Sequence, residues 1–421
     1  MSDSLLSRMA LSVVPVWGAQ RALSALLLQV QALDAQPLDG AHLHALLREV
    51  WVQRGPPLLL RLDHPQTLWT WLQAGRAHGA VPAMAVVEDA WLDDEALLQA
   101  TGAALQGGLP LLWRGGFSRL PSLAAPLLAD MLPLVRLGLE PTLALLAAAR
   151  SAPGAPCAPG AARAPSVRGL LCEQPACAQL GAYCLDRAGA AGVAGWPVED
   201  AALNNAQPGV PSRRVIVSLM DDIERDLSLE RLEQGISRDA VLAWRFLRFA
   251  NSASFGRGDF GSIRHALMLV GVTPLRQWLT EQLPRAVDDP DLRPLQETAV
   301  LTAQLMQAMV DAGSEQQLLR ELYLCGLFSD IDLLCGEPLA DVLRHLPLPG
   351  RVRDAIVLQR GAYAHYLRIV RAQLGRDAAG VAQACAEAEV SLEDANRTLL
   401  LILGRLRPER PLRLPVAATA A

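Results

Sequence analysis

Hydrophobic and polar positions follow two different patterns along this chain of 421 residues. Before about residue 200, short apolar segments of strand length recur, and most are separated by segments with the period of an amphipathic helix. The predicted strands lie near residues 12–17, 57–62, 81–88, 109–114, 132–138, 142–148, 167–172 and 192–197. Strands that alternate with helices form parallel sheets covered by helices, so the first half predicts a parallel α/β barrel.

Two parts of this predicted barrel leave the count of eight strands open. The segment LALLAAA at 143–149 suits a helix as well as a strand. Residues 150–166 are rich in proline and alanine, which predicts a loop.

The second half has the pattern of an all-helical domain. After residue 200, long helical patterns replace the strand-like segments, and residues 204–214, NNAQPGVPSRR, contain the proline, glycine and asparagine of a linker. A chain this long exceeds what one core supports, which also favours two domains. The predicted organisation is a barrel domain at 1–203, a linker at 204–214, a helical domain at 215–405 and a disordered tail at 406–421.

The segment RFLRFANSASFG, residues 245–256, predicts a buried helix and its end. Ser237 or Asp239 can cap a helix through AVLAWRFLRFAN, because these residue types accept hydrogen bonds from the first backbone N–H groups. Arg245 and Arg248 form only a narrow polar edge on this helix, so most of it is expected to be buried. Small polar residues and a glycine then end it: Asn251, Ser252, Ser254 and Gly256.

Two short helices joined by a tight turn follow. Ser262 can cap the first, Gly271 can end it, and Thr273 with Pro274 can start the second. Such a pair could read DNA as a helix-turn-helix, but its many apolar positions favour a packed hairpin. The residues available to contact bases would be Arg264, Arg276 and Gln277.

Composition narrows the compartment and the partners. No uninterrupted apolar run is long enough to cross a bilayer, and the first residues lack the basic start and apolar stretch of a secretion signal. We therefore expect a cytoplasmic protein without membrane insertion. The formal charge of −5 argues against broad attraction to nucleic acid.

The residue types exclude some chemistry. All 38 basic residues are arginine, which excludes a Schiff-base lysine and a phosphate-binding P-loop lysine. His42 and His44 would point apart on a helix, which favours a solvated face over a metal site. The cysteines are odd in number and include no CxxC pair, so we expect free thiols. For the group at 172, 177 and 184, we expect buried thiols rather than redox sensors. The cysteines are residues 157, 172, 177, 184, 325, 335 and 385.

Several segments resemble two bacterial signalling domains. LRFANSASFG at 247–256, SIRHALMLVGVTPLRQWL at 262–279 and YLCGLFSDIDLLCGEPLADVLRHLPLP at 323–349 resemble the HDOD domain, a helical relative of the HD phosphohydrolases, and this resemblance extends to about residue 405. The first half resembles the EAL domain that precedes HDOD in one family of signalling proteins. That resemblance rests on the order and spacing of VVPVWG, LLLRLD, AVVEDAWLDDEALLQATGAALQGGLPLLWRGGF, LPLVRLGL, LLCEQPACAQL and AGAAGVAGWPV.

Active EAL domains hydrolyse cyclic di-GMP with two metal ions held by carboxylates and an asparagine, assisted by a lysine. The resemblance implies that most of these residues are replaced here. The first glutamate should fall near SALLLQ, but no acidic residue occurs between Ser4 and Leu33. By this resemblance, Arg61 occupies the position of the asparagine, and Gly115 with Gly116 occupies that of the aspartate pair. Arg136 occupies the position of the lysine, and Ala194 occupies that of a late glutamine.

Only two carboxylates remain near expected places, Glu88 and Glu173. A two-metal phosphodiester site needs more oxygen ligands than two separate acids supply, so we expect neither metal nor catalysis in the barrel. In the second half, Ser329 occupies the place of the HD histidine and Asp330 alone remains, as the HDOD resemblance implies. The histidines His265, His345 and His365 are not neighbours in sequence, which also argues against a metal site, although convergence in space stays open.

These observations favour a non-enzymatic regulatory protein without cofactors that binds other signalling proteins. Three alternatives stay open: a cyclic di-GMP receptor without hydrolysis, a residual phosphodiesterase and a DNA-binding regulator. In the receptor, Arg61, Arg114 and Arg136 could contact phosphates at the barrel mouth. A homodimer and a hinge at 204–214 also stay open.

Overall fold

The computed structural model describes residues 4–51, 55–79, 81–122, 131–151, 164–251, 262–310, 315–344, 346, 348–375 and 378–412. The chain divides into two compact units. Unit 1 consists of Met1–Pro197 with Ala372–Ala421, and unit 2 consists of Val198–Arg371.

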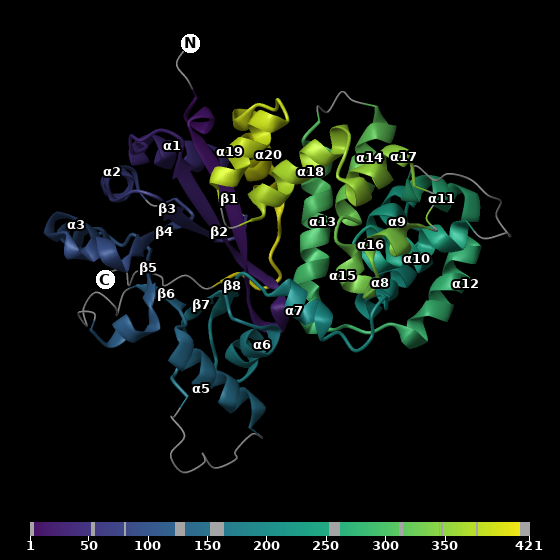
Figure 1. Ribbon diagram of the computed structural model, residues 1–421, viewed down its shortest axis with the longest axis horizontal. Coiled ribbons are helices and arrows are strands. Elements are labelled where there is room, and N and C mark those ends of the chain that lie inside the picture. The colour runs from purple at the N-terminus through teal and green to yellow at the C-terminus, as the bar shows by residue number, and fades with distance from the viewer. Residues whose placement is uncertain are drawn as a thin grey trace. The chain divides into compact units, whose positions relative to one another are not determined.

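Unit 1 contains a closed barrel of eight strands, in the order in which they occur along the chain (Figure 1). The strands are β1 Met9–Trp17, β2 Leu23–Ala32, β3 Leu58–Leu62, β4 Ala83–Glu88, β5 Leu111–Gly116, β6 Leu132–Arg136, β7 Leu171–Glu173 and β8 Gly192–Ala194. Strands β2 to β8 are parallel, whereas β1 is antiparallel to both of its neighbours, β2 and β8. The predicted barrel is confirmed, with one strand reversed.

The structure corrects the strand prediction at two places. Strand β2 was missed, because LSALLLQVQA is a nearly continuous apolar run that periodicity cannot distinguish from a buried helix. The predicted strand at 142–148 lies within helix α5, Leu139–Arg150, whose alanines and leucines favour a helix. The two errors cancel in the count of strands.

Alternate residues of the strands fill the inside of the barrel, as the two-residue period of a strand requires. The buried cluster comprises Val14, Val16, Ala25, Leu27, Leu59, Met84, Val86, Leu112, Leu134, Leu171, Ala194 and Leu412. The last of these comes from the end of the described chain, where the Leu412 N–H donates to the Ser24 carbonyl at 2.8 Å. Residues 406–412 of the predicted disordered tail therefore end in the barrel core, and 413–421 lie outside the described residues.

Helices follow the strands on the outside of the barrel (Figure 1). They are α1 Gly40–Val50, α2 Pro65–His78, α3 Glu95–Gln106, α5 and α6 Ala178–Asp186. Asp39 and Asp94 cap α1 and α3 by accepting hydrogen bonds from backbone N–H groups of the first turn. On α1, His44 is buried against the Trp71 ring, with ring centroids 5.0 Å apart, so the predicted solvated face holds for His42 but not for His44.

Two C-terminal helices, α19 Ala379–Glu387 and α20 Leu392–Arg405, contact β1 in unit 1. Asn396 on α20 is fully buried: its Nδ2 donates to the Leu6 carbonyl at 2.8 Å and the Met9 carbonyl at 2.7 Å, and its Oδ1 accepts from the Leu11 N–H at 3.2 Å. The sequence assigned these helices to the helical domain, which was predicted to end at 405. The structure assigns them to the barrel unit, because a buried amide joins the two segments across about 390 residues of chain.

Unit 2 is helical. Its α-helices are α7 Val198–Leu203, α8 Arg213–Glu224, α9 Leu229–Ile236, α10 Ala240–Ala250, α11 Ile263–Val270, α12 Val272–Gln282, α13 Arg293–Ala308, α14 Gln316–Leu327, α15 Ile331–Cys335, α16 Leu339–Arg344, α17 Gly350–Arg353 and α18 Ala362–Gln373, which continues into unit 1. Shorter helical segments of the chain are η1 Leu5–Ser7, η2 Ala19–Arg21, η3 Asp89–Asp93, η4 Phe117–Ser122, η5 Leu283–Arg285, η6 Pro290–Leu292 and η7 Asp354–Leu358.

Helix α10 is buried as predicted, and its cap is Asp239 rather than Ser237. The Asp239 carboxylate accepts from the Leu242 N–H at 3.0 Å and from the Ser212 N–H at 2.6 Å, and its complete burial raises its pKa. The helix ends at Ala250, before Asn251. Ser252, Ser254 and Gly256, which were predicted to end it, lie outside the described residues.

The segment predicted as a linker, residues 204–214, forms hydrogen bonds within unit 2. The Gly209 N–H donates to the Leu334 carbonyl at 2.8 Å, and Arg245 Nε donates to the Gly209 carbonyl at the same distance. Of the helices that the structure describes, none combines the length and the apolar character that a bilayer span requires.

Candidate functional site

Charged side chains from five strands meet at one end of the barrel. Parallel strands end on the same side of a barrel, so residues at their carboxyl ends come together. Arg61 lies on β3, Glu88 ends β4, Arg114 lies on β5, Arg136 ends β6 and Glu173 ends β7. In the strand register, Glu88 lies opposite Arg114, and Arg136 lies opposite Glu173.

Arg114 binds both carboxylates of this group. Its Nε and Nη2 donate to the two oxygens of Glu173, each at 2.9 Å, and its Nη1 lies 2.8 Å from both oxygens of Glu88. Arg61 Nε donates to Glu88 Oε1 at 3.0 Å. These are the short, charge-assisted contacts of a guanidinium bound to carboxylates.

The network is buried and balanced in charge. The side chains of Arg114 and Glu173 are 8% and 5% exposed, and that of Glu88 is 16% exposed. Burial lowers the pKa of the Arg114 guanidinium, but the hydrogen bonds and charges of Glu173 and Glu88 outweigh this and raise it. Two guanidiniums and two carboxylates cancel, so a divalent cation here would have to displace an arginine.

A cavity of about 490 Å³ lies at this end of the barrel. Arg61, Arg114 and Arg136 all line it, so the three predicted phosphate contacts share one cavity. The Arg114 guanidinium donates hydrogen bonds to two carboxylates, whereas the Arg136 side chain is exposed. Other lining residues come from β2 and from the loops after the strands, and include Gln29, Gln31, Asp63 and Trp91.

Of the two positions that resemble the EAL aspartate pair, Gly115 leaves little room for an acidic side chain. A Cβ atom at Gly115 would lie 2.3 Å from the ring of Trp113, which is 1% exposed. The Trp113 Nε1 donates to Asp89 Oδ1 at 3.3 Å, and Arg119 Nε donates to the other oxygen of Asp89 at 2.9 Å. Within the described residues, no three His, Cys, Asp or Glu side chains are grouped as a metal ion would require.

The residues at the expected position of the HD pair, Ser329 and Asp330 in unit 2, are arranged in a similar way. Ser329 Oγ donates to Asp330 Oδ2 at 2.7 Å, and Arg371 Nη2 donates to Asp330 Oδ1 at 2.8 Å and to the Ser329 carbonyl at 3.1 Å. A guanidinium again neutralises the remaining acid. His365 contacts Arg368 through Nδ1 at 2.7 Å, and His345 lies outside the described residues.

Each residue considered for DNA contacts on α11 and α12 lies near an acidic side chain of unit 2. Arg264 Nη1 donates to Glu233 at 3.4 Å, Arg276 Nη2 donates to Glu224 at 3.3 Å, and Gln277 contacts Glu281 at 3.5 Å. The cysteines other than Cys177 that the structure describes are buried, and Cys157 lies outside the described residues. A hydrogen bond with the Cys184 thiol and burial both raise the pKa of Cys172.

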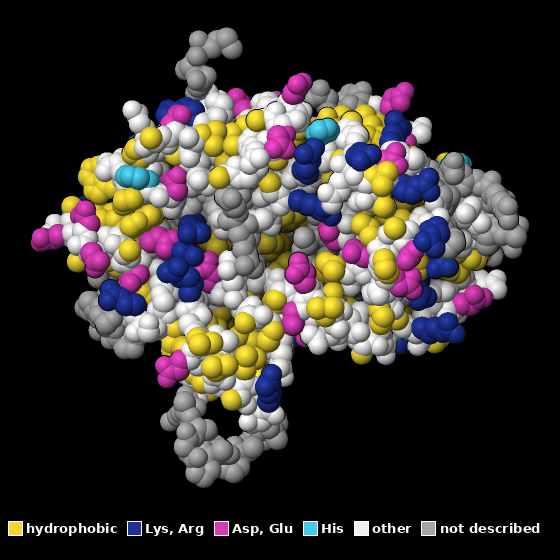
Figure 2. Space-filling view, in the orientation of Figure 1, with side chains coloured by type: hydrophobic (Ala, Val, Ile, Leu, Met, Phe, Trp, Pro, Cys, Tyr) yellow, Lys and Arg dark blue, Asp and Glu magenta, His cyan; other side chains and the backbone are white. Residues whose placement is uncertain are grey.

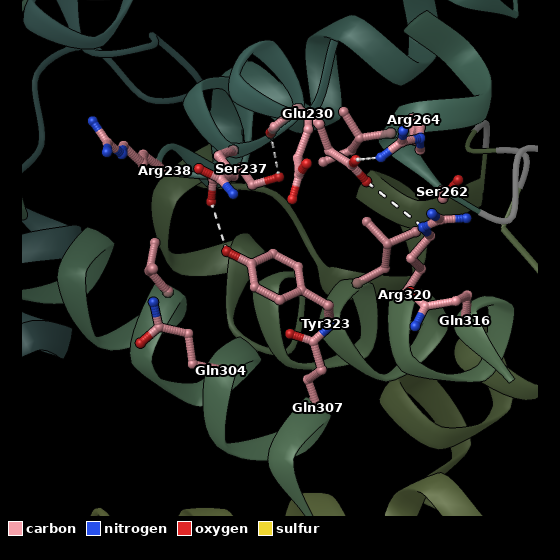
Figure 3. A pocket seen from close by; sticks show the side chains of 15 residues that line it. Glu230, Ser237, Arg238, Ser262, Arg264, Gln304, Gln307, Gln316, Arg320 and Tyr323 are labelled. Atoms are coloured by element: carbon pink, nitrogen blue, oxygen red, sulfur yellow. Dashed lines mark hydrogen bonds and ion pairs between the residues drawn. The ribbon is translucent and has the colours of Figure 1, made fainter. Parts of the chain in front are cut away.

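Unit 2 contains a second cavity, of about 480 Å³, that the sequence analysis missed. Residues of α9, α11, α13 and α14 line it, together with Ser237, Arg238 and Ser262 (Figure 3). Tyr323 lies in the middle of the cavity wall and its hydroxyl donates to the Ser237 carbonyl at 3.1 Å.

Comparison with known proteins identifies part of unit 2. Residues 211–340 match the family model of the HDOD domain, which confirms the resemblance there. The chain is 24% identical over 192 residues to cyclic di-GMP phosphodiesterase CdgJ of Vibrio cholerae, an alignment that covers 45% of this chain and 44% of that protein. It is 24% identical over 159 residues to the uncharacterized protein YuxH of Bacillus subtilis, covering 36% and 38% of the two chains.

The alignments thus span less than half the length of either curated relative. Among solved structures, the MmoQ response regulator of Methylococcus capsulatus aligns with 47% of this chain and 98% of its own, at 21% identity and a TM-score of 0.37.

Proposed function

We propose that this chain is a non-catalytic signal-transduction protein whose barrel is a degenerate EAL domain and whose two units bind other signalling proteins. The observation that carries this proposal is the position of Arg114. Its guanidinium binds both Glu88 and Glu173, the only two carboxylates that the EAL resemblance places at the metal site.

The electrostatics of the mouth support the absence of hydrolysis. A two-metal mechanism uses cations to activate the attacking water and to neutralise charge on the phosphate. At this mouth the carboxylates already have a cationic partner that cannot lose its proton or activate water. The HDOD domain supports the same conclusion, because Arg371 neutralises Asp330.

Hydrolysis by the purified full-length chain tests the proposal. We expect no linear dinucleotide or mononucleotide above a protein-free control when the chain is incubated with cyclic di-GMP and Mg²⁺ or Mn²⁺ and the products are separated chromatographically. Metal-dependent product formation that persists in a second, independent preparation would overturn the non-catalytic assignment. The name of the Vibrio relative describes that protein, and this assay decides whether its activity extends to this chain.

A cyclic di-GMP receptor is the second candidate, and the cavity of about 490 Å³ at the barrel mouth favours it. Arg61 and Arg136 line this cavity and carry the charge that phosphates require. A calorimetric titration separates the two candidates. The receptor requires saturable binding that weakens about ten-fold or more in R61A/R136A, whereas the platform proposal expects no heat of binding at this site.

Binding of protein partners is tested with the full chain in two steps. Proteins that co-purify with it from the native cell are identified and then produced in pure form. The platform proposal expects at least one of them to bind the purified chain directly, and it loses its support if none does.

A further inference from the structure

The cavity of unit 2 is built from four elements of the HDOD region and lies apart from the HD position, since neither Ser329 nor Asp330 lines it. Its walls combine three arginines, four glutamines and a tyrosine, with two acids on α9.

One side of the cavity has the chemistry of a phosphate site. Arg264, Arg320, Ser262 and Gln316 lie together on this side in Figure 3. Helix α11 begins directly after Ser262, and α14 begins at Gln316, so the positive ends of two helix dipoles also lie at this wall. In the space-filling view, arginine side chains lie among acidic ones over the helices of unit 2 (Figure 2).

The arginines of this side are held only loosely by protein groups. Glu233 Oε2 lies 3.4 Å from Arg264 Nη1, and Glu233 Oε1 lies 3.9 Å from Arg320 Nε. Close guanidinium–carboxylate pairs are about 2.7–2.9 Å apart, and each guanidinium has about five N–H donors. Arg264 and Arg320 therefore keep donors that an anion could engage without breaking a tight ion pair.

The opposite side carries amide groups next to apolar surface. Gln304 and Gln307 of α13 lie below Tyr323 in Figure 3, and Arg238 lies above it on the same side. Glutamine amides pair with two edge atoms of a purine at once, and guanidiniums do the same with guanine. The Tyr323 ring, with Val300 and Leu324, offers an apolar surface for a flat base.

The size of the cavity limits the occupant. A volume of about 480 Å³ falls within the range of about 300–1,000 Å³ typical of sites for whole organic ligands, and an inorganic phosphate or a short dicarboxylate would leave most of it unfilled. We propose that this cavity binds a purine nucleotide, with its phosphate toward Arg264 and Arg320 and its base toward Gln304 and Gln307. This ligand site does not depend on the proposed function of the barrel.

Calorimetric titration of the full-length chain tests the proposal with four probes: GMP, AMP, guanosine and inorganic phosphate. We expect saturable binding of at least one nucleotide at concentrations below about 1 mM, with guanosine and inorganic phosphate each at least ten-fold weaker. No saturable nucleotide binding up to about 1 mM would overturn the proposal. Equal binding of nucleotide and inorganic phosphate would overturn it too, since the base would then contribute nothing.

Variants place the ligand. R320Q and R264Q should each weaken nucleotide binding about ten-fold or more, because each removes a charge-assisted contact to the phosphate. Q307L should weaken the binding of the nucleotide and leave the weak binding of inorganic phosphate unchanged. This variant also keeps the test valid if an arginine variant fails to fold. Arg276 is exposed and does not line the cavity, so R276Q is the matched control. This variant should bind the nucleotide like the original chain.

The barrel mouth is the competing location. The R61Q/R136Q double variant should bind the nucleotide like the original chain. If this double variant loses binding while R320Q and R264Q retain it, the nucleotide belongs at the barrel mouth and the proposal is wrong.

Discussion

The barrel mouth and the cavity of unit 2 use the same residue types in opposite ways. At the mouth, Arg114 is 8% exposed and lies 2.8–2.9 Å from two carboxylates, so its donors are used by the protein itself. In the cavity, Arg320 is 32% exposed and its acidic partner is 3.9 Å away. The distance and the burial of an ion pair, rather than the residues that form it, therefore decide whether an arginine is structural or is available to a ligand.

The largest expected effect is that of removing the structural arginine. R114A leaves Glu173 buried without its cation and Glu88 paired only with the partly exposed Arg61, which costs about 3–5 kcal/mol in the free energy of unfolding. Urea unfolding followed by circular dichroism measures this change. A loss below about 1 kcal/mol, the value typical of surface pairs, would contradict the structural role of Arg114.

An intermediate effect is expected at Glu321 on α14, whose pair combines features of both regions. The carboxylate is fully buried, whereas the side chain of its partner Arg351 is 56% exposed. Arg351 Nη2 donates to Glu321 Oε1 at 2.7 Å, and the Tyr363 hydroxyl donates to Oε2 at 3.1 Å. E321Q should lower the free energy of unfolding by about 1–3 kcal/mol, because it weakens these contacts but leaves the arginine in water.

The same residue predicts a pH dependence. Burial raises the pKa of Glu321, but hydrogen bonds from Arg351, Gln317 and Tyr363 outweigh burial and hold the pKa below the ordinary value of 4.5. A carboxyl with a lowered pKa in the folded state stabilises the fold above pH 4.5, and this stability is lost as the pH falls through the folded pKa. The difference in stability between the original chain and E321Q should therefore shrink below pH 4.5, and a difference that grows there would contradict the assignment.

The smallest effect on stability is expected for the cavity arginine. R320A removes only a long, partly exposed pair, so the free energy of unfolding should fall by less than about 1 kcal/mol. The same urea titration applies, with R114A as the matched comparison. Equal losses for the two variants would mean that both arginines are structural, and the contrast between the two regions would disappear.

The sequence by itself determined much of the architecture, because the relevant signals are local. Alternation of apolar segments predicted the barrel, and the residue types around Asp239 and Ser262 predicted helix starts that the structure has. The same approach failed at 23–32 and 142–148, where leucine and alanine runs suit either element until neighbouring strands select one.

What only the tertiary structure decided depends on residues that are distant in sequence. Arg114 meets Glu88 and Glu173, which lie 26 and 59 positions away, and Asn396 joins α20 to the first strand. The cavity of unit 2 combines side chains from four helices. Local patterns specify which face of an element is buried, but the distance between two charges depends on how the strands and helices pack. That distance separates a buried ion pair from a candidate ligand site in this protein.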